Sequence, residues 1–166
     1  MGSDDDLLPL DGEGPAREVS VRPFAIDPFA VTNEWFAAFV RETGYVTDAE
    51  RLGWSYVFHS FLGSRQADFA APHGTRWWRN VPGACWHAPE GPGSDIEGRG
   101  DHPAVHISWN DATAFAEWVG GRLPTEAEWE FASRGGLEGR RFPWGDDEPT
   151  DTQAECCNIW QGSFRH

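Results

Sequence analysis

The sequence contains no lysine. All 13 of its basic residues are arginine, and they face 27 acidic residues, which gives a formal net charge of −14. A chain this negative repels the phosphate backbone of nucleic acids, and the same charge opposes docking on anionic membrane surfaces. We therefore expect neither nucleic acid nor a membrane among its partners.

Long apolar runs are missing as well. No segment approaches the roughly 20 apolar residues of a membrane helix, and the acidic opening at residues 1–6 (MGSDDD) has the wrong charge for a signal peptide. Cysteine is scarce, and the odd set of Cys85, Cys156 and Cys157 cannot build a disulfide framework. These features together predict a reducing, cytoplasmic location.

Tryptophan, glycine and proline are abundant: the 166 residues include 10 Trp, 19 Gly and 12 Pro. This length suits one compact domain. Large rings supply apolar area for a core, while Gly and Pro interrupt regular structure. The composition therefore excludes a helix bundle or coiled coil and favours a core of large rings held by an irregular, turn-rich backbone.

Three helices are expected from local signals. Thr32 or Asn33 can cap a helix that runs to about residue 43, and a second helix is expected at about 110–119. A third follows Thr125, which forms a capping box with Glu128.

Alternation of polar and apolar residues predicts strands at residues 17–22, 24–31 and 103–108. Residues 44–100 are expected to be rich in loops but packed, because aromatic residues are scattered among their glycines and prolines. In the third helix, Ala127 and Phe131 share a face that we expect to be buried.

Several polar side chains could suggest chemistry. His102 and His106 are four residues apart, but on a strand this spacing is about 13 Å, too far for one metal ion. Structural roles are therefore expected for both histidines. Paired carboxylates for acid–base chemistry could be read into Glu126, Glu128 and Glu130, but each has a structural explanation. Glu126 suits the positive end of the helix dipole, Glu128 belongs to the capping box, and Glu130 can pair with the arginine four residues later.

The adjacent pair Cys156–Cys157 lacks the Cys-x-x-Cys spacing that stabilises a thiolate. Directly after it, Asn158 offers an amide oxygen and Ile159 a backbone carbonyl, which are the hard donors that calcium prefers. Calcium takes six to eight oxygens, so these two residues could form only part of a site. From chemistry alone, the sequence names no reaction.

Longer strings carry a resemblance to a known family. Residues 121–136 (GRLPTEAEWEFASRGG) resemble a signature of the sulfatase-modifying-factor superfamily, and residues 106–112 (HISWNDA) and 142–145 (FPWG) fit the same pattern. That superfamily also contains ergothioneine-pathway enzymes and binding proteins.

Three further regions look like the formylglycine-generating enzymes within that superfamily. They are 43–51 (TGYVTDAER), 89–95 (PEGPGSD) with 101–103 (DHP), and 158–162 (NIWQG). The resemblance runs over nearly the whole chain.

The resemblance implies an activity and its cofactors. Such enzymes use dioxygen and a copper(I) ion held by two cysteines to oxidise the cysteine of a sulfatase Cys-x-Pro-x-Arg motif to Cα-formylglycine. Their α+β fold is similar to C-type lectins, has little regular secondary structure and binds calcium. Asn158 and Ile159 align with part of one calcium site as side-chain and backbone donors. The expected partner is thus a sulfatase polypeptide, and the chain is expected to be a monomer.

Departures from the family pattern shape the expectation for this chain. Nothing in it matches the copper-binding string Arg-Gly-Gly-Ser-Tyr-x-Cys-x-x-Ser-Tyr-Cys, and Cys156 and Cys157 stand in another context. We therefore expect residues 1–166 to be a single partial domain without an internal boundary, the amino-terminal portion of such an enzyme. No catalytic residue is assigned within it, the copper site lies outside it, and by itself it should be inactive.

Two alternatives remain open at this point. A non-catalytic, C-type-lectin-like binding module of the same superfamily would also lack a copper site. An ergothioneine-type sulfoxide synthase domain ranks last, because no His-x-x-x-His-x-Glu-like iron motif precedes the segment. Residues Trp54, Trp77 and Trp78 are candidates for a substrate groove, although core packing is the expected role for most of them.

Overall fold

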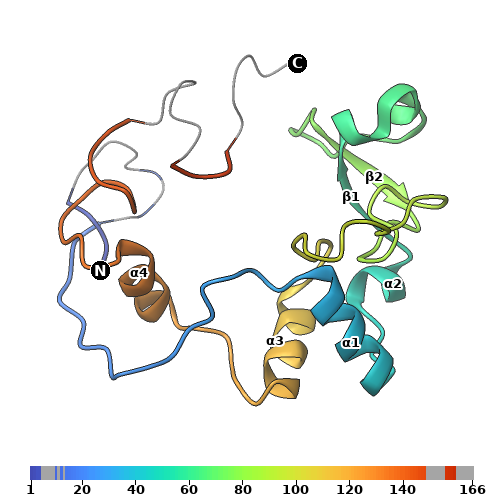
Figure 1. The fold of residues 1–166 in the computed structure, drawn as a ribbon. Helices are drawn as coiled ribbons and strands as arrows, with labels where there is room; N and C mark the ends of the chain where they lie inside the picture. Colours follow the sequence, from blue (N-terminus) through green and yellow to red (C-terminus); the bar gives the residue numbers. More distant parts are fainter. Residues whose placement is uncertain (5–9, 11, 13, 149–155, 160–166) are drawn as a thin grey trace. The chain divides into compact units, whose positions relative to one another are not determined.

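The computed structural model describes residues 1–4, 10, 12, 14–148 and 156–159 (Figure 1). These residues form two compact units. The larger spans residues 27–123, and the smaller combines residues 1–26 with the described part of 124–165. The two units differ in which residues contact one another within the chain. This division does not test the prediction of a single partial domain, which stays a prediction.

Helix α1 (Asn33–Thr43) of the larger unit has the ends that its sequence predicts. The Thr32 hydroxyl accepts a hydrogen bond from the Trp35 N–H, and Gly44 ends the helix in the left-handed conformation at φ 68°. Helix α3 (Trp109–Trp118) begins one residue earlier than expected, because Ser108 and Asp111 form a capping box at its start.

Two helical segments of the larger unit were not predicted. Helix α2 (Asp48–Leu52) begins with a capping box of Thr47 and Glu50, a Thr-x-x-Glu spacing that is visible in the sequence. The 3₁₀ segment η2 (His59–Asp68) is kinked at Gly63, whose φ of 55° and ψ of −128° are not helical. Both lie in the stretch 44–100 that was expected to be rich in loops.

One antiparallel sheet of two strands lies in the larger unit. Strand β1 (Trp54–Phe58) pairs with β2 (Trp78–Pro82), from Trp54 opposite Pro82 to Phe58 opposite Trp78. Side chains alternate between the faces of a strand, so Val57 and Val81 point to the buried side while Trp54, Tyr56 and Phe58 share the other face.

The prediction of strands at residues 17–22, 24–31 and 103–108 was wrong. In the described residues these segments are not strands, and what remains of the third is an isolated bridge between Thr32 and Pro103. Alternation marks a half-buried extended segment, but a strand also needs a partner ladder. Pro23, Pro28 and Pro103 lack the N–H that such a ladder requires.

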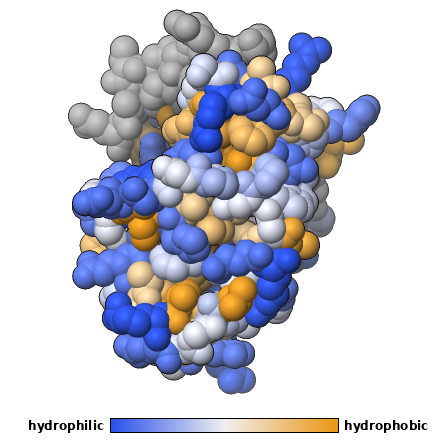
Figure 2. Space-filling model, turned by 90° about the vertical axis from the view of Figure 1, so that its right-hand side faces the viewer, coloured by the Kyte–Doolittle hydropathy of each residue, from blue (hydrophilic) through white to orange (hydrophobic). Residues whose placement is uncertain are grey.

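The core of the larger unit consists of two hydrophobic clusters. The aromatic cluster consists of Phe36, Phe39, Trp86 and Phe115, and the sheet cluster of Val57, Leu62, Val81 and Ala84. Other hydrophobic side chains reach the surface. Figure 2 shows them as separate orange areas among hydrophilic residues on the side that lies at the right of Figure 1.

The smaller unit contains helix α4 (Glu126–Arg134). The predicted Thr125–Glu128 capping box is confirmed, and Gly135 ends the helix at φ 53°. Phe131, which was expected to be buried, is instead 65% exposed. The described contact of its ring is an edge-on one with Phe24, with centroids 6.3 Å apart, and this covers one side of the ring.

Candidate functional site

The predicted calcium ligands Asn158 and Ile159 are both exposed, in the short described stretch 156–159. The Ile159 N–H donates to the Cys157 carbonyl at 3.0 Å. Residues 160–162, which complete the NIWQG string, lie outside the described residues. Asn158 and Ile159 can supply two oxygen donors, so the described chain fits a fraction of a calcium shell and not a whole one.

The cysteines do not fit a copper(I) site in the described residues. Cys85 is buried in the larger unit, and burial raises the pKa of its thiol, which disfavours the thiolate that a metal needs. Cys156 and Cys157 are half-buried neighbours in the smaller unit, and all three cysteines are free. Nowhere in the described residues do three His, Cys, Asp or Glu side chains gather closely enough to hold a metal ion.

The two histidines considered as a metal pair have different surroundings. His102 is exposed, whereas His106 is half-buried. The His106 ring lies 2.8 Å from the Ser55 hydroxyl and 2.9 Å from the Pro89 carbonyl oxygen. The structure thus gives His106 the structural role that the sequence predicts, through partners that the sequence did not identify.

The glutamates of α4 have structural partners. The Glu128 carboxylate accepts from the Thr125 N–H at 2.8 Å, and Glu130 forms an ion pair with Arg134 at 2.9 Å. Partial burial alone would raise the pKa of Glu130, but the Gly2 N–H and the Arg134 guanidinium outweigh it and hold this pKa below its ordinary value. Both carboxylates therefore stabilise α4, and its lowered pKa keeps Glu130 ionised.

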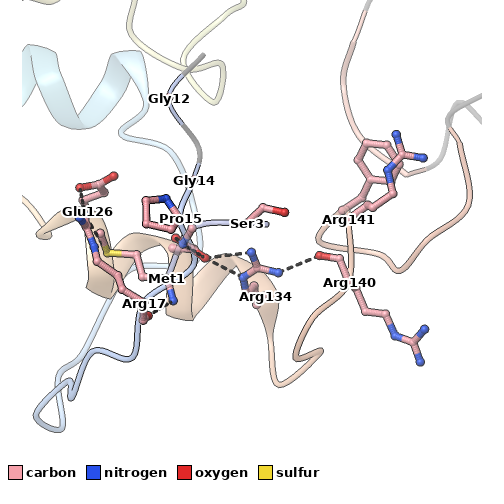
Figure 3. A pocket seen from close by; sticks show the side chains of 13 residues that line it. Met1, Ser3, Gly12, Gly14, Pro15, Arg17, Glu126, Arg134, Arg140 and Arg141 are labelled. Atoms are coloured by element: carbon pink, nitrogen blue, oxygen red, sulfur yellow. Dashed lines mark hydrogen bonds and ion pairs between the residues drawn. The ribbon is translucent and has the colours of Figure 1, made fainter. Parts of the chain in front are cut away.

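A polar pocket of about 400 Å³ lies within the smaller unit (Figure 3). Its charged lining residues are Arg17, Glu126, Glu130, Arg134, Arg140 and Arg141. In Figure 3 the Arg134 guanidinium bonds to the Arg140 carbonyl, while the Arg140 side chain points away. Arg140 is paired with Asp146 and Arg141 with Glu148. Positive charge at this pocket is thus largely neutralised by the chain itself.

The three candidate groove tryptophans lie at or beside the sheet. Trp54 in β1 is half-buried, whereas Trp78 in β2 and its neighbour Trp77 are exposed at 39% and 37%. Trp54 packs edge-on against Tyr56, with ring centroids 5.0 Å apart. These rings therefore lie outside both buried clusters of the core.

Comparison with known proteins defines the class of the chain. It belongs to the family of the sulfatase-modifying factor enzyme 1-like domain, whose model matches residues 1–166. The family resemblance inferred from the sequence strings is thereby confirmed.

No helix in the described part of the chain is both long and apolar enough to cross a membrane.

Similar proteins point to one branch of this family. The chain is 59% identical over 165 residues to a formylglycine-generating enzyme of Thermomonospora curvata, covering 98% of the chain and 54% of that protein. It is 60% identical over 159 residues to the formylglycine-generating enzyme of Streptomyces coelicolor, covering 95% of the chain and 50% of that protein. The chain thus spans about half the length of these curated relatives.

A mouse relative carries a different description. The protein named inactive C-alpha-formylglycine-generating enzyme 2 is 54% identical over 157 residues, which cover 93% of the chain and 49% of that protein. High identity to this chain is therefore shared by relatives named formylglycine-generating enzyme and by one whose name calls it inactive.

Proposed function

We propose that this chain forms part of a formylglycine-generating oxidase. Its substrate is a sulfatase polypeptide, and the cysteine of a Cys-x-Pro-x-Arg motif is converted to Cα-formylglycine with dioxygen and copper. The observation that carries the proposal is the identity of 59–60% to two formylglycine-generating enzymes over nearly the whole chain. A C-type-lectin-like arrangement, a monomeric state and a cytoplasmic location belong to the same proposal.

The copper ion would be bound by residues outside the described part of the chain. By the family resemblance, its two cysteines belong to a string that residues 1–166 do not contain. The burial of Cys85 is in line with this, because a buried thiol with a raised pKa is a poor ligand. No residue of the described chain is therefore assigned a step in the oxidation.

A chimera tests the proposed function. Residues 1–166 replace the matching segment of the Thermomonospora curvata enzyme, and a Cys-x-Pro-x-Arg peptide is incubated with the chimera, copper and oxygen. We expect formylglycine, detected by mass spectrometry, at a rate within about tenfold of the parent enzyme, a loss of no more than about 1.4 kcal/mol in transition-state stabilisation. Residues 1–166 alone should leave the peptide unmodified.

The control is a second chimera with the matching segment of the inactive mouse relative. If the first chimera folds, as shown by a cooperative melt, and yet forms no formylglycine, the proposed function is wrong. Activity in both chimeras would place the cause of the mouse protein's inactivity outside this segment and would still support the oxidase.

A second candidate is a non-catalytic binding module of the same family. The observation that favours it is the 54% identity to the mouse protein described as inactive. Reading the gene beyond residue 166 separates the two: a downstream Ser-Tyr-x-Cys string supports the oxidase, and a stop codon supports the module.

We also propose that Asn158 and Ile159 contribute a side-chain and a backbone oxygen to a calcium site. In a protein that carries this chain and binds calcium, Asn158→Ala should weaken calcium binding at least about tenfold, because one ligand is lost. Isothermal titration with CaCl₂ measures the effect. Asp101→Ala removes an exposed carboxylate of the other unit and serves as the control. Equal affinities in the two variants would contradict the assignment.

A further inference from the structure

His106 has a backbone conformation that its residue type rarely adopts. Its φ is 59°, and among the described residues it is the one non-glycine with a positive φ. The left-handed region is unfavourable for a residue with a Cβ, so such a conformation persists only where surrounding contacts hold it. For His106, these contacts include the hydrogen bonds of its side chain.

The two ring contacts determine which nitrogen of the neutral His106 ring carries the hydrogen. A carbonyl oxygen can only accept, so the Nε2 atom, 2.9 Å from the Pro89 carbonyl, carries the hydrogen. In a neutral ring Nδ1 is then an acceptor, and the Ser55 hydroxyl, 2.8 Å away, donates to it. Both ring nitrogens are thus used by the neutral form.

These contacts join segments that are distant in the sequence. Ser55 belongs to β1 and lies on the same side of the sheet as buried Val57, while Trp54 and Tyr56 lie on the opposite side. Pro89 belongs to the loop between β2 and α3. The backbone of the same loop also approaches β2 closely, because a Cβ on Gly91 would lie only 2.7 Å from the Cγ1 atom of Val81. The loop therefore holds both strands, and His106 provides its polar link to β1.

Charge around the ring comes mainly from the same loop. Burial of the ring lowers the pKa of His106 below its ordinary value. The Glu90 carboxylate acts in the opposite sense, but it is already bound by the Arg99 guanidinium at 2.9 Å and 3.3 Å. Ser55, the contact from β1, carries no charge.

We propose that His106 is a proton-sensitive latch that fixes the two-stranded sheet to the loop of Pro89 and thereby sets the orientation of the aromatic face of β1. Protonation adds an N–H at Nδ1, so the Ser55 hydroxyl must stop donating and turn, and it places a charge in a half-buried site. The latch is closed while the ring is neutral and loosens on acidification. This inference goes beyond the proposed oxidase function and does not depend on it.

The direction of the pH effect follows from linkage. A histidine with a lowered pKa in the folded state binds fewer protons than in the unfolded state. Its stabilising contribution is present above the ordinary histidine pKa of about 6.5 and is lost as the pH falls through the lower, folded value. The sheet should therefore become less protected in mildly acidic solution.

Amide hydrogen exchange of the whole chain tests the latch. Protection factors of β1 and β2, corrected for intrinsic exchange, are measured between about pH 7.5 and about pH 5, the range in which histidine titrates. Protection should fall severalfold in the wild type, and His106→Asn should show low protection that changes little with pH. Asn is chosen because it tolerates a positive φ but is too short to span both partners.

His102→Asn is the matched control, because His102 is exposed. In this variant the protection of β1 and β2 should depend on pH as it does in the wild type. Nitrogen NMR of the wild type should show the neutral ring protonated at Nε2. If His106→Asn does not fold, Ser55→Ala decides: it should lower the protection of β1 severalfold at about pH 7.5. A wild-type pH response in His106→Asn, an unchanged β1 in Ser55→Ala, or a ring protonated at Nδ1 would overturn the proposal.

Discussion

Replacing Phe36 by alanine is expected to lower the free energy of unfolding of the larger unit by about 3–5 kcal/mol. Phe36 is 1% exposed and lies at the centre of the aromatic cluster. Its ring centroid is 5.4 Å from that of Trp86, 5.5 Å from that of Phe39 and 6.0 Å from that of Phe115. Alanine would therefore remove buried apolar area and leave a cavity that three rings cannot easily fill.

Urea unfolding followed by tryptophan fluorescence measures this loss, and Trp86 within the cluster is one of the 10 tryptophans that contribute to the signal. Phe29→Ala is the matched control: the same atoms are removed from a residue of the same unit that is 80% exposed. It should change the free energy of unfolding by no more than about 0.5 kcal/mol. If the two variants lose equal stability, Phe36 is not the centre of the core.

The second large effect is expected at Asp111. This carboxylate is completely buried in the larger unit. It accepts hydrogen bonds from the Tyr45 hydroxyl at 3.1 Å, the Asp48 N–H at 3.0 Å and the Ser108 N–H at 2.9 Å. One side chain thus caps its own helix α3 and also the start of α2.

Asp111→Asn should lower the free energy of unfolding by about 3 kcal/mol or more, although the shape of the side chain hardly changes. One carboxylate oxygen becomes an NH₂ group, which meets N–H donors at Ser108 or Asp48 and leaves a buried donor without an acceptor. The acceptor charge is lost at the same time. Urea unfolding again supplies the measurement.

Asp101→Asn makes the same chemical change at an exposed residue of the same unit, and it should be nearly neutral. A tolerated Asp111→Asn would show that the three hydrogen bonds do not need an ionised acceptor. Tyr45 gives a second measure of the contact. Burial raises the pKa of its phenol and Asp111 raises it further, so the variant should bring this pKa back toward its ordinary value.

Helix ends could be predicted because their signals are local. A Thr hydroxyl and an acidic side chain three residues later decide the start of α4, and Gly44 ends α1 through its left-handed conformation. Helix α2 obeys the same rule and was overlooked, because its five residues are too few to show a helical period.

Strands and the contacts of the candidate site depend on distant partners. The pairing of β1 with β2 joins Trp54 to Pro82, and alternation within either segment does not specify that register. The contact of His106 with Ser55 spans 51 residues. Asn158 and Ile159 were assigned through the family resemblance, and a partial set of oxygen donors has no pattern of its own in the sequence.

The division of the chain into a continuous larger unit and a discontinuous smaller one sets an order of events during synthesis. Residues 27–123 form the larger unit as one continuous stretch, so this unit can fold once they have left the ribosome. The smaller unit must wait, because Glu130 of α4 accepts a hydrogen bond from the N–H of Gly2, 128 residues earlier. The amino-terminal segment therefore emerges first and finds its partner last, after the larger unit has been synthesised.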